Sequence, residues 1–184
     1  GATVYGPSAT PPTAAGTYTV TVTVAANGNY ASASSSATAF TINVATPVVT
    51  VTVGGPYIFN AAPQGPNAAT NTGTGSSYTF SYVGTGATVY GPSATPPTNV
   101  GTYTVTATVA ADGNYSAASS SATAFSIGLA TPVVTPTVGT YTYNGSPQGP
   151  NAATNTGTGS SYTFSYVGTG ATVYGPSATP PTAA

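Results

Sequence analysis

Asp112 is the only residue in this chain of 184 whose side chain carries a charge, because Lys, Arg, His and Glu are all absent. General acid–base catalysis normally needs a histidine, a lysine or a pair of carboxylates. A serine triad would lack its base, and one carboxylate cannot build a high-affinity calcium site. We therefore expect no catalytic residue, no metal ligand set and no cofactor.

A lone aspartate can still shape the backbone. Asp112 is followed by Gly113 directly after a strand-like segment, and Asp-Gly is a favoured pair for a type I′ hairpin turn. The same position in an earlier copy of the sequence holds Asn27 and Gly28, another type I′ pair. Asparagine keeps the turn and removes the carboxylate, so we interpret these four residues as turn residues.

The composition excludes several classes of partner. Without Lys or Arg the chain cannot neutralise phosphates, so we expect no nucleic-acid partner and no electrostatic membrane anchor. No apolar run approaches the roughly 20 residues of a membrane-spanning helix, so we expect no membrane insertion within this sequence. Thr, Val, Tyr, Gly and Pro dominate and strong helix formers other than Ala are scarce, which predicts an all-β protein.

The chain repeats itself. The sequence GATVYGPSATPPT begins at Gly1, Gly86 and Gly170, which gives spacings of 85 and 84 residues. Boundaries at Val44/Ala45 and Leu129/Ala130 make residues 1–44 the C-terminal half of a repeat, 45–129 a complete repeat domain, and 130–184 the N-terminal part of the next. We expect the sequence to be cut from a longer repetitive polypeptide. Residues 130–169 and 1–44 add up to one unit, but 170–184 then duplicate 1–15, so the arithmetic does not predict clean completion of one chain by another.

Alternating residues mark the strands within a repeat. In residues 101–109 apolar side chains occupy every second position, which predicts a half-buried strand with an inward apolar face. The outward face carries Thr102, Thr104, Thr106 and Thr108. Six or seven short strands in about 85 residues predict tandem antiparallel β-sandwiches of immunoglobulin-like size. A β-grasp or open-roll arrangement is the alternative.

Two sets of side chains are candidates for surface contact. The threonine row on residues 101–109, and the similar row on residues 16–24, are possible contact surfaces, and flat threonine rows occur in some ice-binding proteins. The tyrosines beside the turns and loops could bind sugars if exposed, although we interpret them mainly as core residues with the hydroxyl at the edge. These tyrosines are Tyr5, Tyr30, Tyr90, Tyr115 and Tyr174.

Three motifs carry a resemblance to a known family. The opening YNGSPQ runs from Tyr143 to Gln148, PTNVGTYTV runs from Pro97 to Val105, and Asn114-Tyr115 form the late turn. Together they resemble MBG-type repeats of large bacterial surface proteins, once in full and twice in part, with PYIFNAAPQ departing from the opening motif. The resemblance implies an extracellular, cell-surface module of a stalk, a filament or an adhesin used in cell adhesion, without known catalytic residues.

We therefore expect a structural module of an extracellular fibre or adhesin stalk, built from tandem β-domains that self-associate into a filament. Its partners would be other copies of itself, in tandem and laterally, with glycans as a further candidate. Because almost no charge is present to repel neighbouring copies, the strength of that association should not depend on pH or salt concentration. The alternative is a ligand-binding module that takes carbohydrate on tyrosines or ice on threonine rows.

Overall fold

The computed structural model describes residues 4–182, and within them the regular secondary structure is entirely β, which confirms the predicted all-β class. Residues up to Leu129 form one compact unit and residues from Ala130 form a second, and each is described by itself. The strands of the first unit before residue 60 are β1 (Gly16–Val20), β2 (Thr23–Val24), β3 (Ala33–Ser34), β4 (Thr38–Ile42), β5 (Val49–Thr52) and β6 (Tyr57–Ile58). The remaining strands are β7 (Ala68–Asn71), β8 (Tyr78–Gly84), β9 (Gly101–Val109), β10 (Ala118–Ser119), β11 (Thr123–Gly128), β12 (Val134–Pro136) and β13 (Ala153–Asn155).

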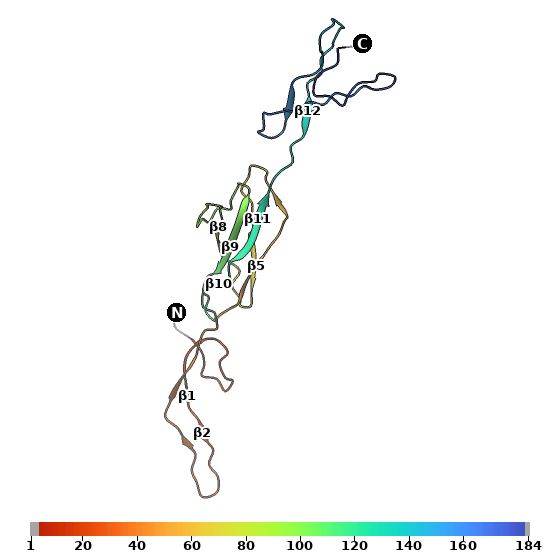
Figure 1. Cartoon of the computed structure of the whole chain (residues 1–184). Coiled ribbons are helices and arrows are strands. Elements are labelled where there is room, and N and C mark those ends of the chain that lie inside the picture. The colour runs from red at the N-terminus through yellow and green to blue at the C-terminus, as the bar shows by residue number, and fades with distance from the viewer. Residues whose placement is uncertain (1–3, 183–184) are drawn as a thin grey trace. The chain divides into compact units, whose positions relative to one another are not determined.

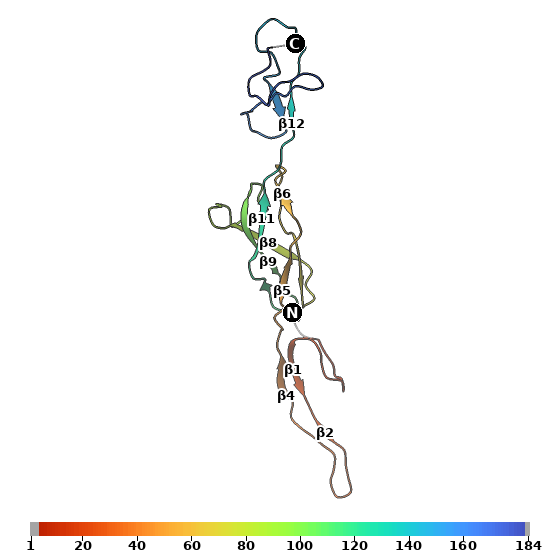
Figure 2. The same ribbon diagram turned by 45° about the vertical axis from the view of Figure 1, so that its right-hand side comes forward.

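Strand β9 is the centre of the five-stranded sheet (Figure 1). Its first edge pairs antiparallel with β8 over residues 78–84. Its second edge pairs with β11 near the start of β9 and with β10 near its end. The sheet ends at β6, which pairs with β11 in parallel (Figure 2). The prediction of antiparallel pairing is therefore wrong at this strand pair and at the isolated bridge between Ala45 and Tyr115, because each joins an early segment of the repeat to a late segment that runs in the same direction.

The core of residues 45–129 lies between this sheet and the antiparallel pair β5–β7. Tyr103, Val105, Ala107 and Val109 of β9 are all buried, as the alternation predicts. They pack with Val49 and Val51 of β5 and with buried aromatic residues of β8 and β11. The rings of Tyr103 and Phe125 stack with centroids 5.4 Å apart. This packing resembles a sandwich of a large and a small sheet, whereas an immunoglobulin-like topology and the repeat boundaries stay predictions.

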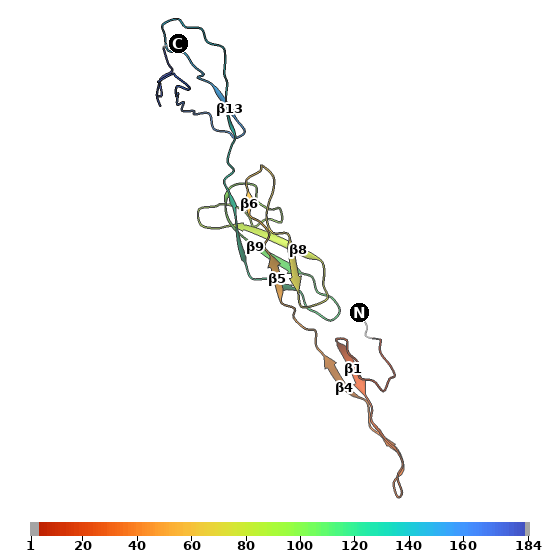
Figure 3. The same cartoon turned by 90° about the vertical axis from the view of Figure 1, so that its right-hand side faces the viewer.

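Residues 16–24 have the sequence of β9 apart from Val22, which stands where β9 has Ala107. They form two shorter strands, β1 and β2, which pair with β4 and β3 (Figure 3). No strand pairs with the other edge of β1 or β2 within the described residues. The strand is interrupted at residues 21–22, whereas β9 is continuous where it pairs with β8. We infer that pairing with β8 keeps β9 in one continuous strand.

The second unit shows that the sequence of β8 likewise depends on its partner strand. Its strands β12 and β13 pair as β5 and β7 do. Residues 162–168 repeat the sequence of β8, YTFSYVG, yet they are not a strand. Only the bridge between Tyr166 and Ser177 forms, which matches the bridge between Tyr82 and Ser93 in the complete repeat. The sequence of β8 therefore becomes a strand where β9 lies beside it.

Candidate functional site

The carboxylate of Asp112 organises the loop that follows β9. Its Oδ1 accepts hydrogen bonds from the backbone N–H groups of Asn114 and Tyr115, both at 3.0 Å. Its Oδ2 accepts a hydrogen bond from the hydroxyl of Thr74. The Thr74 hydroxyl first, and then the backbone N–H groups, hold the pKa of Asp112 below its ordinary value, against a smaller opposing effect of desolvation. The ionised carboxylate is thus used to hold backbone and hydroxyl groups in place.

The predicted type I′ geometry is wrong in both copies. Neither Asp112 nor Gly113 has positive φ, and in the first copy Gly28 has φ 49° while Asn27 does not have positive φ. The centre of the first turn is Gly28-Asn29, because Asn27 and Tyr30 exchange two backbone hydrogen bonds of 2.9 Å around it. In the second copy the Asp112 side chain takes the amide hydrogen bond that the backbone carbonyl of Asn27 takes in the first, as in an Asx turn. All four residues still lie at turns, one position away from the expected centre.

The same loop holds the first residue of the complete repeat and makes one hydrogen bond across the joint to the partial repeat before it. The carbonyl of Asn114 accepts a hydrogen bond from the N–H of Ala45 at 2.9 Å, and the N–H of Ser116 donates to the carbonyl of Ala45 at 2.8 Å. The side-chain Oδ1 of Asn114 also accepts a hydrogen bond from the N–H of Ala15 at 2.8 Å. We call these contacts the joint clasp. Sequence reasoning missed the joint clasp, because its partners lie 69 or more residues apart and no local pattern marks them.

The threonine row on β9 is only partly open to solvent. Thr102 is exposed, whereas Thr104, Thr106 and Thr108 are half-buried. Several hydroxyls already have partners: Thr102 donates to the carbonyl of Thr85, and Thr108 shares a 2.7 Å hydrogen bond with Ser119. On the neighbouring strand β8, Thr79 and Ser81 face Thr108 and Thr106, so the hydroxyl-bearing face extends over two strands. Its use as a contact surface stays a prediction.

The tyrosines divide between core and surface. Tyr82 and Tyr103 are buried, and the Tyr82 hydroxyl donates to the carbonyl of Pro66 while the Tyr103 hydroxyl donates to that of Asn99. Burial raises the pKa of both tyrosines, and nearby tyrosines contribute to the same direction. Among the tyrosines beside loops, Tyr90, Tyr115 and Tyr174 are half-buried, whereas Tyr5 and Tyr30 are exposed.

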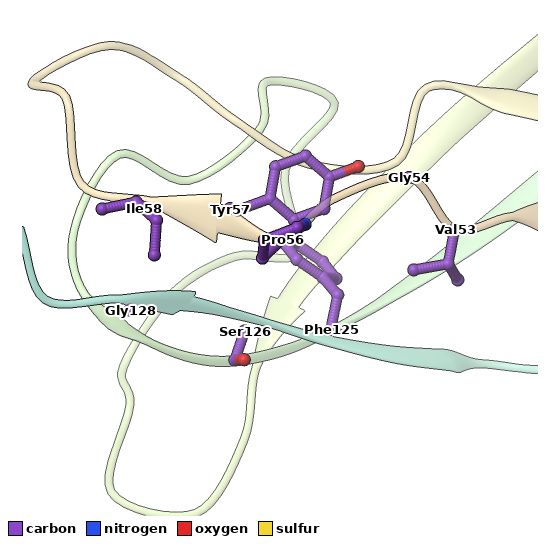
Figure 4. A pocket seen from close by; sticks show the side chains of 8 residues that line it. All are labelled: Val53, Gly54, Pro56, Tyr57, Ile58, Phe125, Ser126 and Gly128. Atoms are coloured by element: carbon purple, nitrogen blue, oxygen red, sulfur yellow. The ribbon is translucent and has the colours of Figure 1, made fainter.

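An apolar pocket opens between β6 and β11 (Figure 4). The ring of Tyr57 stands beside Phe125, with centroids 5.8 Å apart and planes at 70°. The remaining lining residues are Val53, Gly54, Pro56, Ile58, Ser126 and Gly128. Sequence reasoning missed this pocket, because it depends on the parallel pairing of two strands that are far apart in the chain. The PYIFN stretch, which departs from the resemblance, was the only signal of something distinct there.

The described residues contain no group of three or more His, Cys, Asp or Glu side chains that could hold a metal ion. In residues 4–182, every buried side-chain nitrogen or oxygen has a hydrogen-bond partner. No helix among those residues is long and apolar enough to cross a membrane. Apart from Asp112, the polar side chains of residues 4–182 are hydroxyls and amides.

Comparison with known families gives one match, to the MBG domain, over residues 2–46 and again over residues 49–131. Comparison with curated proteins and with solved structures finds no match. The two matched stretches cover the partial repeat that contains β1–β4 and the complete repeat built around β9. The chain belongs to the MBG domain family, whose domains are repeat modules of large surface proteins.

Proposed function

We propose that this chain is a structural module of an extracellular fibre or adhesin stalk, in which each repeat is attached directly to the next. The joint clasp is the observation that carries this proposal. Ala45 bonds through both its N–H and its carbonyl to the loop at the end of β9, and Asn114 also reaches back to Ala15. The bond from Ala15 crosses the joint, and the bonds of Ala45 tie the start of the complete repeat to its own loop. Together they restrict bending, whereas a flexible spacer would use a Gly- and Ser-rich linker.

The joint clasp can be tested by measuring distances, because the chain has no cysteine of its own. Cysteines placed at the exposed positions Ser36 and Ser121 would carry spin labels on either side of the joint. We expect double electron–electron resonance to give a narrow distribution of distances between the two spin labels. Replacing Asn114 and Ser116 with alanine removes the side-chain bonds to Ala15 and Thr46 while the two backbone bonds to Ala45 remain, and the loss of the bond to Ala15 should broaden the distribution. The control Asn29→Ala changes the corresponding loop of the first copy and should leave the distribution unchanged. A broad distribution in the parent chain would contradict a fixed joint.

We further propose that such modules associate side by side into filaments. The surface has one charged side chain, so two modules meet almost no long-range repulsion and salt has little to screen. Repeated weak contacts between hydroxyl-bearing faces gain strength through avidity. Sedimentation from low salt to about 1 M, and from pH 5 to 9, should show association that does not change. Dispersal as salt rises would mean that charges hold the assembly and would overturn this part of the proposal.

One observation supports the alternative of a carbohydrate-binding module. The pocket beside β6 and β11 presents the ring of Tyr57 next to Phe125, and aromatic faces can stack on sugars. The ice-binding alternative has less support, since three of the four threonines on β9 are half-buried. Binding to an array of soluble glycans, lost in Tyr57→Ala, would favour the carbohydrate-binding module. If the parent chain binds no glycan on the array, the carbohydrate-binding alternative is excluded.

A further inference from the structure

One valine in each copy of the repeat projects into solvent without any cover. Val89 of the complete repeat is 99% exposed, and its counterparts Val4 and Val173 are 94% and 100% exposed. Val89 stays uncovered although both halves of its repeat are present, so no missing part of a repeat is needed to explain this exposure. We call Val89 the knob, because its side chain contributes no apolar burial to its own repeat.

The loop that carries the knob is tied to β8 and to the core. The N–H of Gly84 donates to the carbonyl of Tyr90 at 2.8 Å. The ring of Tyr90 lies edge-on to that of Tyr103, with centroids 5.9 Å apart, and packs against the core. Because successive side chains of an extended segment point to opposite sides, the inward Tyr90 turns Val89 outward. The exposed valine is therefore held in place on the surface.

The pocket between β6 and β11 is open and apolar (Figure 4). Two residues that line it, Val53 and Ile58, are 47% and 49% exposed, and the rings of Tyr57 and Phe125 line it as well. Its volume of about 360 Å³ accommodates a valine side chain, and no lining residue carries a charge. The pocket is therefore suited to a small, branched, uncharged group that enters from solvent.

The knob and the pocket lie at opposite edges of the five-stranded sheet. At one edge β8 pairs with β9, and the bridge between Tyr82 and Ser93 runs the end of the knob loop along the outer side of β8. At the other edge β6 pairs with β11, and β9 and β11 stand between the two edges. A repeat therefore cannot place its knob in its own pocket, whereas two neighbouring molecules can be joined edge to edge.

We propose that the knob of one molecule inserts into the pocket of a second copy of this chain. The inference rests on the side-by-side association proposed above and gives it a specific contact at the sheet edges. Two observations identify the occupant as a second copy. The complete repeat carries one knob and one pocket, so their numbers match between any two molecules. Both are apolar and uncharged, so burying a charged partner there would cost desolvation without a compensating pair.

The contact joins two different surfaces, so it is not closed when two molecules meet. A molecule whose knob is inserted still offers its pocket to a third, and heterologous contacts of this kind extend into open assemblies unless they close into a ring. One inserted valine buries far less than the roughly 1,200 Å² of a stable protein interface, so a single contact is weak. Knobs recur about every 85 residues, and several contacts between two chains strengthen one another. Association should therefore depend on protein concentration and not on salt.

A disulfide can trap the contact, because the chain has no cysteine of its own. Val89→Cys in one full-length chain and Ser126→Cys in another place one thiol at the knob and one in the pocket lining. The two thiols are oxidised by dissolved oxygen to a disulfide only where their Cα atoms come within about 7 Å. We expect the mixture to give a linked heterodimer. Ser121→Cys, at an exposed serine just before β11, is the control and should not link to Val89→Cys.

A charge in the pocket should abolish the association. Val53→Asp places a carboxylate in the pocket lining, and Val48→Asp places the same charge at an exposed valine outside the pocket. In sedimentation velocity, complexes of the parent chain and of Val48→Asp should grow in mass with concentration, whereas Val53→Asp should stay monomeric. Thermal unfolding of both variants shows whether the repeat at 45–129 remains folded. If Val53→Asp fails to fold, the cross-linking variants still decide the question.

Two results would overturn the proposal: Val89→Cys that links to Ser126→Cys no faster than to Ser121→Cys, or growth that persists in a folded Val53→Asp. Persistent growth in Val53→Asp that salt does not change would leave side-by-side association standing through another surface. A parent chain that stays monomeric at all concentrations but binds a glycan would overturn both the docking and the association in favour of the carbohydrate-binding module.

Discussion

At the scale of single residues, the Tyr82 hydroxyl is the most consequential polar group of the core. It donates a 2.7 Å hydrogen bond to the carbonyl of Pro66, and both residues are almost fully buried. Tyr82→Phe leaves that carbonyl unpaired and should cost about 1–3 kcal/mol of unfolding free energy. Denaturant unfolding measures the loss. Tyr143→Phe, at an exposed tyrosine, is the matched control and should stay within about 0.5 kcal/mol. Equal effects of the two substitutions would contradict this reading of the core.

The single carboxylate gives a second prediction at this scale. Asp112→Asn keeps an oxygen acceptor for the loop amides but not the second acceptor used by Thr74, so it should lower the melting temperature at pH 7 less than Asp112→Ala does. Because the pKa of Asp112 is lowered in the folded chain, its contribution is present above the ordinary value of 3.8 and is lost as pH falls below it. Melting curves at pH 7 and pH 3 should therefore differ for the parent chain more than for Asp112→Asn. If the parent chain has the same melting temperature at pH 7 and pH 3, the ionised carboxylate of Asp112 does not stabilise the fold.

At the scale of strands, two copies of one sequence lie in different surroundings. Val105→Ala removes a buried side chain from the sheet centre and should cost roughly 2 kcal/mol. Val20→Ala changes the corresponding residue of β1, which is half-exposed, and should cost under about 0.5 kcal/mol in dilute solution. Denaturant unfolding of both variants at low concentration provides the comparison. Similar costs would mean that the face of β1 is already covered.

The strands also show how far sequence reasoning reached. Alternation correctly predicted which residues of β9 are buried, because a side-chain period of two depends only on local backbone geometry. It also placed turns near Asp112 and Asn27 but set their centres one residue too early, because both residues accept the closing amide hydrogen bond, Asn27 with its backbone carbonyl and Asp112 with its side chain. The joint clasp, the pocket at Tyr57 and the parallel pair β6–β11 depend on contacts between distant segments. The same YTFSYVG sequence is a strand in one place and not in another, so pattern alone could not decide it.

At the scale of the whole molecule, the near absence of charge leaves few groups that titrate. Apart from Asp112, the ionisable side chains are tyrosines, so stability should be flat between about pH 5 and 9. Burial raises the pKa of Tyr82 and Tyr103 above 10.0 in the folded chain. Their contribution is therefore fully present below pH 10.0 and is lost as pH rises through the raised values.

Alkaline titration followed by circular dichroism and tyrosinate absorbance should show cooperative unfolding above that point. The double variant Tyr82→Phe and Tyr103→Phe cannot ionise at these sites. Between pH 7 and the alkaline range it should therefore lose a smaller fraction of its unfolding free energy than the parent chain loses. Unfolding at the same pH in both proteins would show that other tyrosines drive it.

The parallel pairing of β6 with β11 has a mechanical consequence for a repeat in a stalk under tension. The chain enters the repeat at Ala45, passes through β5 to β6 and leaves just after β11, and residues 57–58 pair with residues 127–128 in the same direction. A pull on the two ends of the repeat draws these strands past each other along their length, so the hydrogen bonds between them are loaded in shear and must fail together. An antiparallel pair at this position would instead open one bond at a time, like a zip. This pairing of two residues from each strand, as short as that of β10 with β9, thus lies where extension of the repeat loads it in shear.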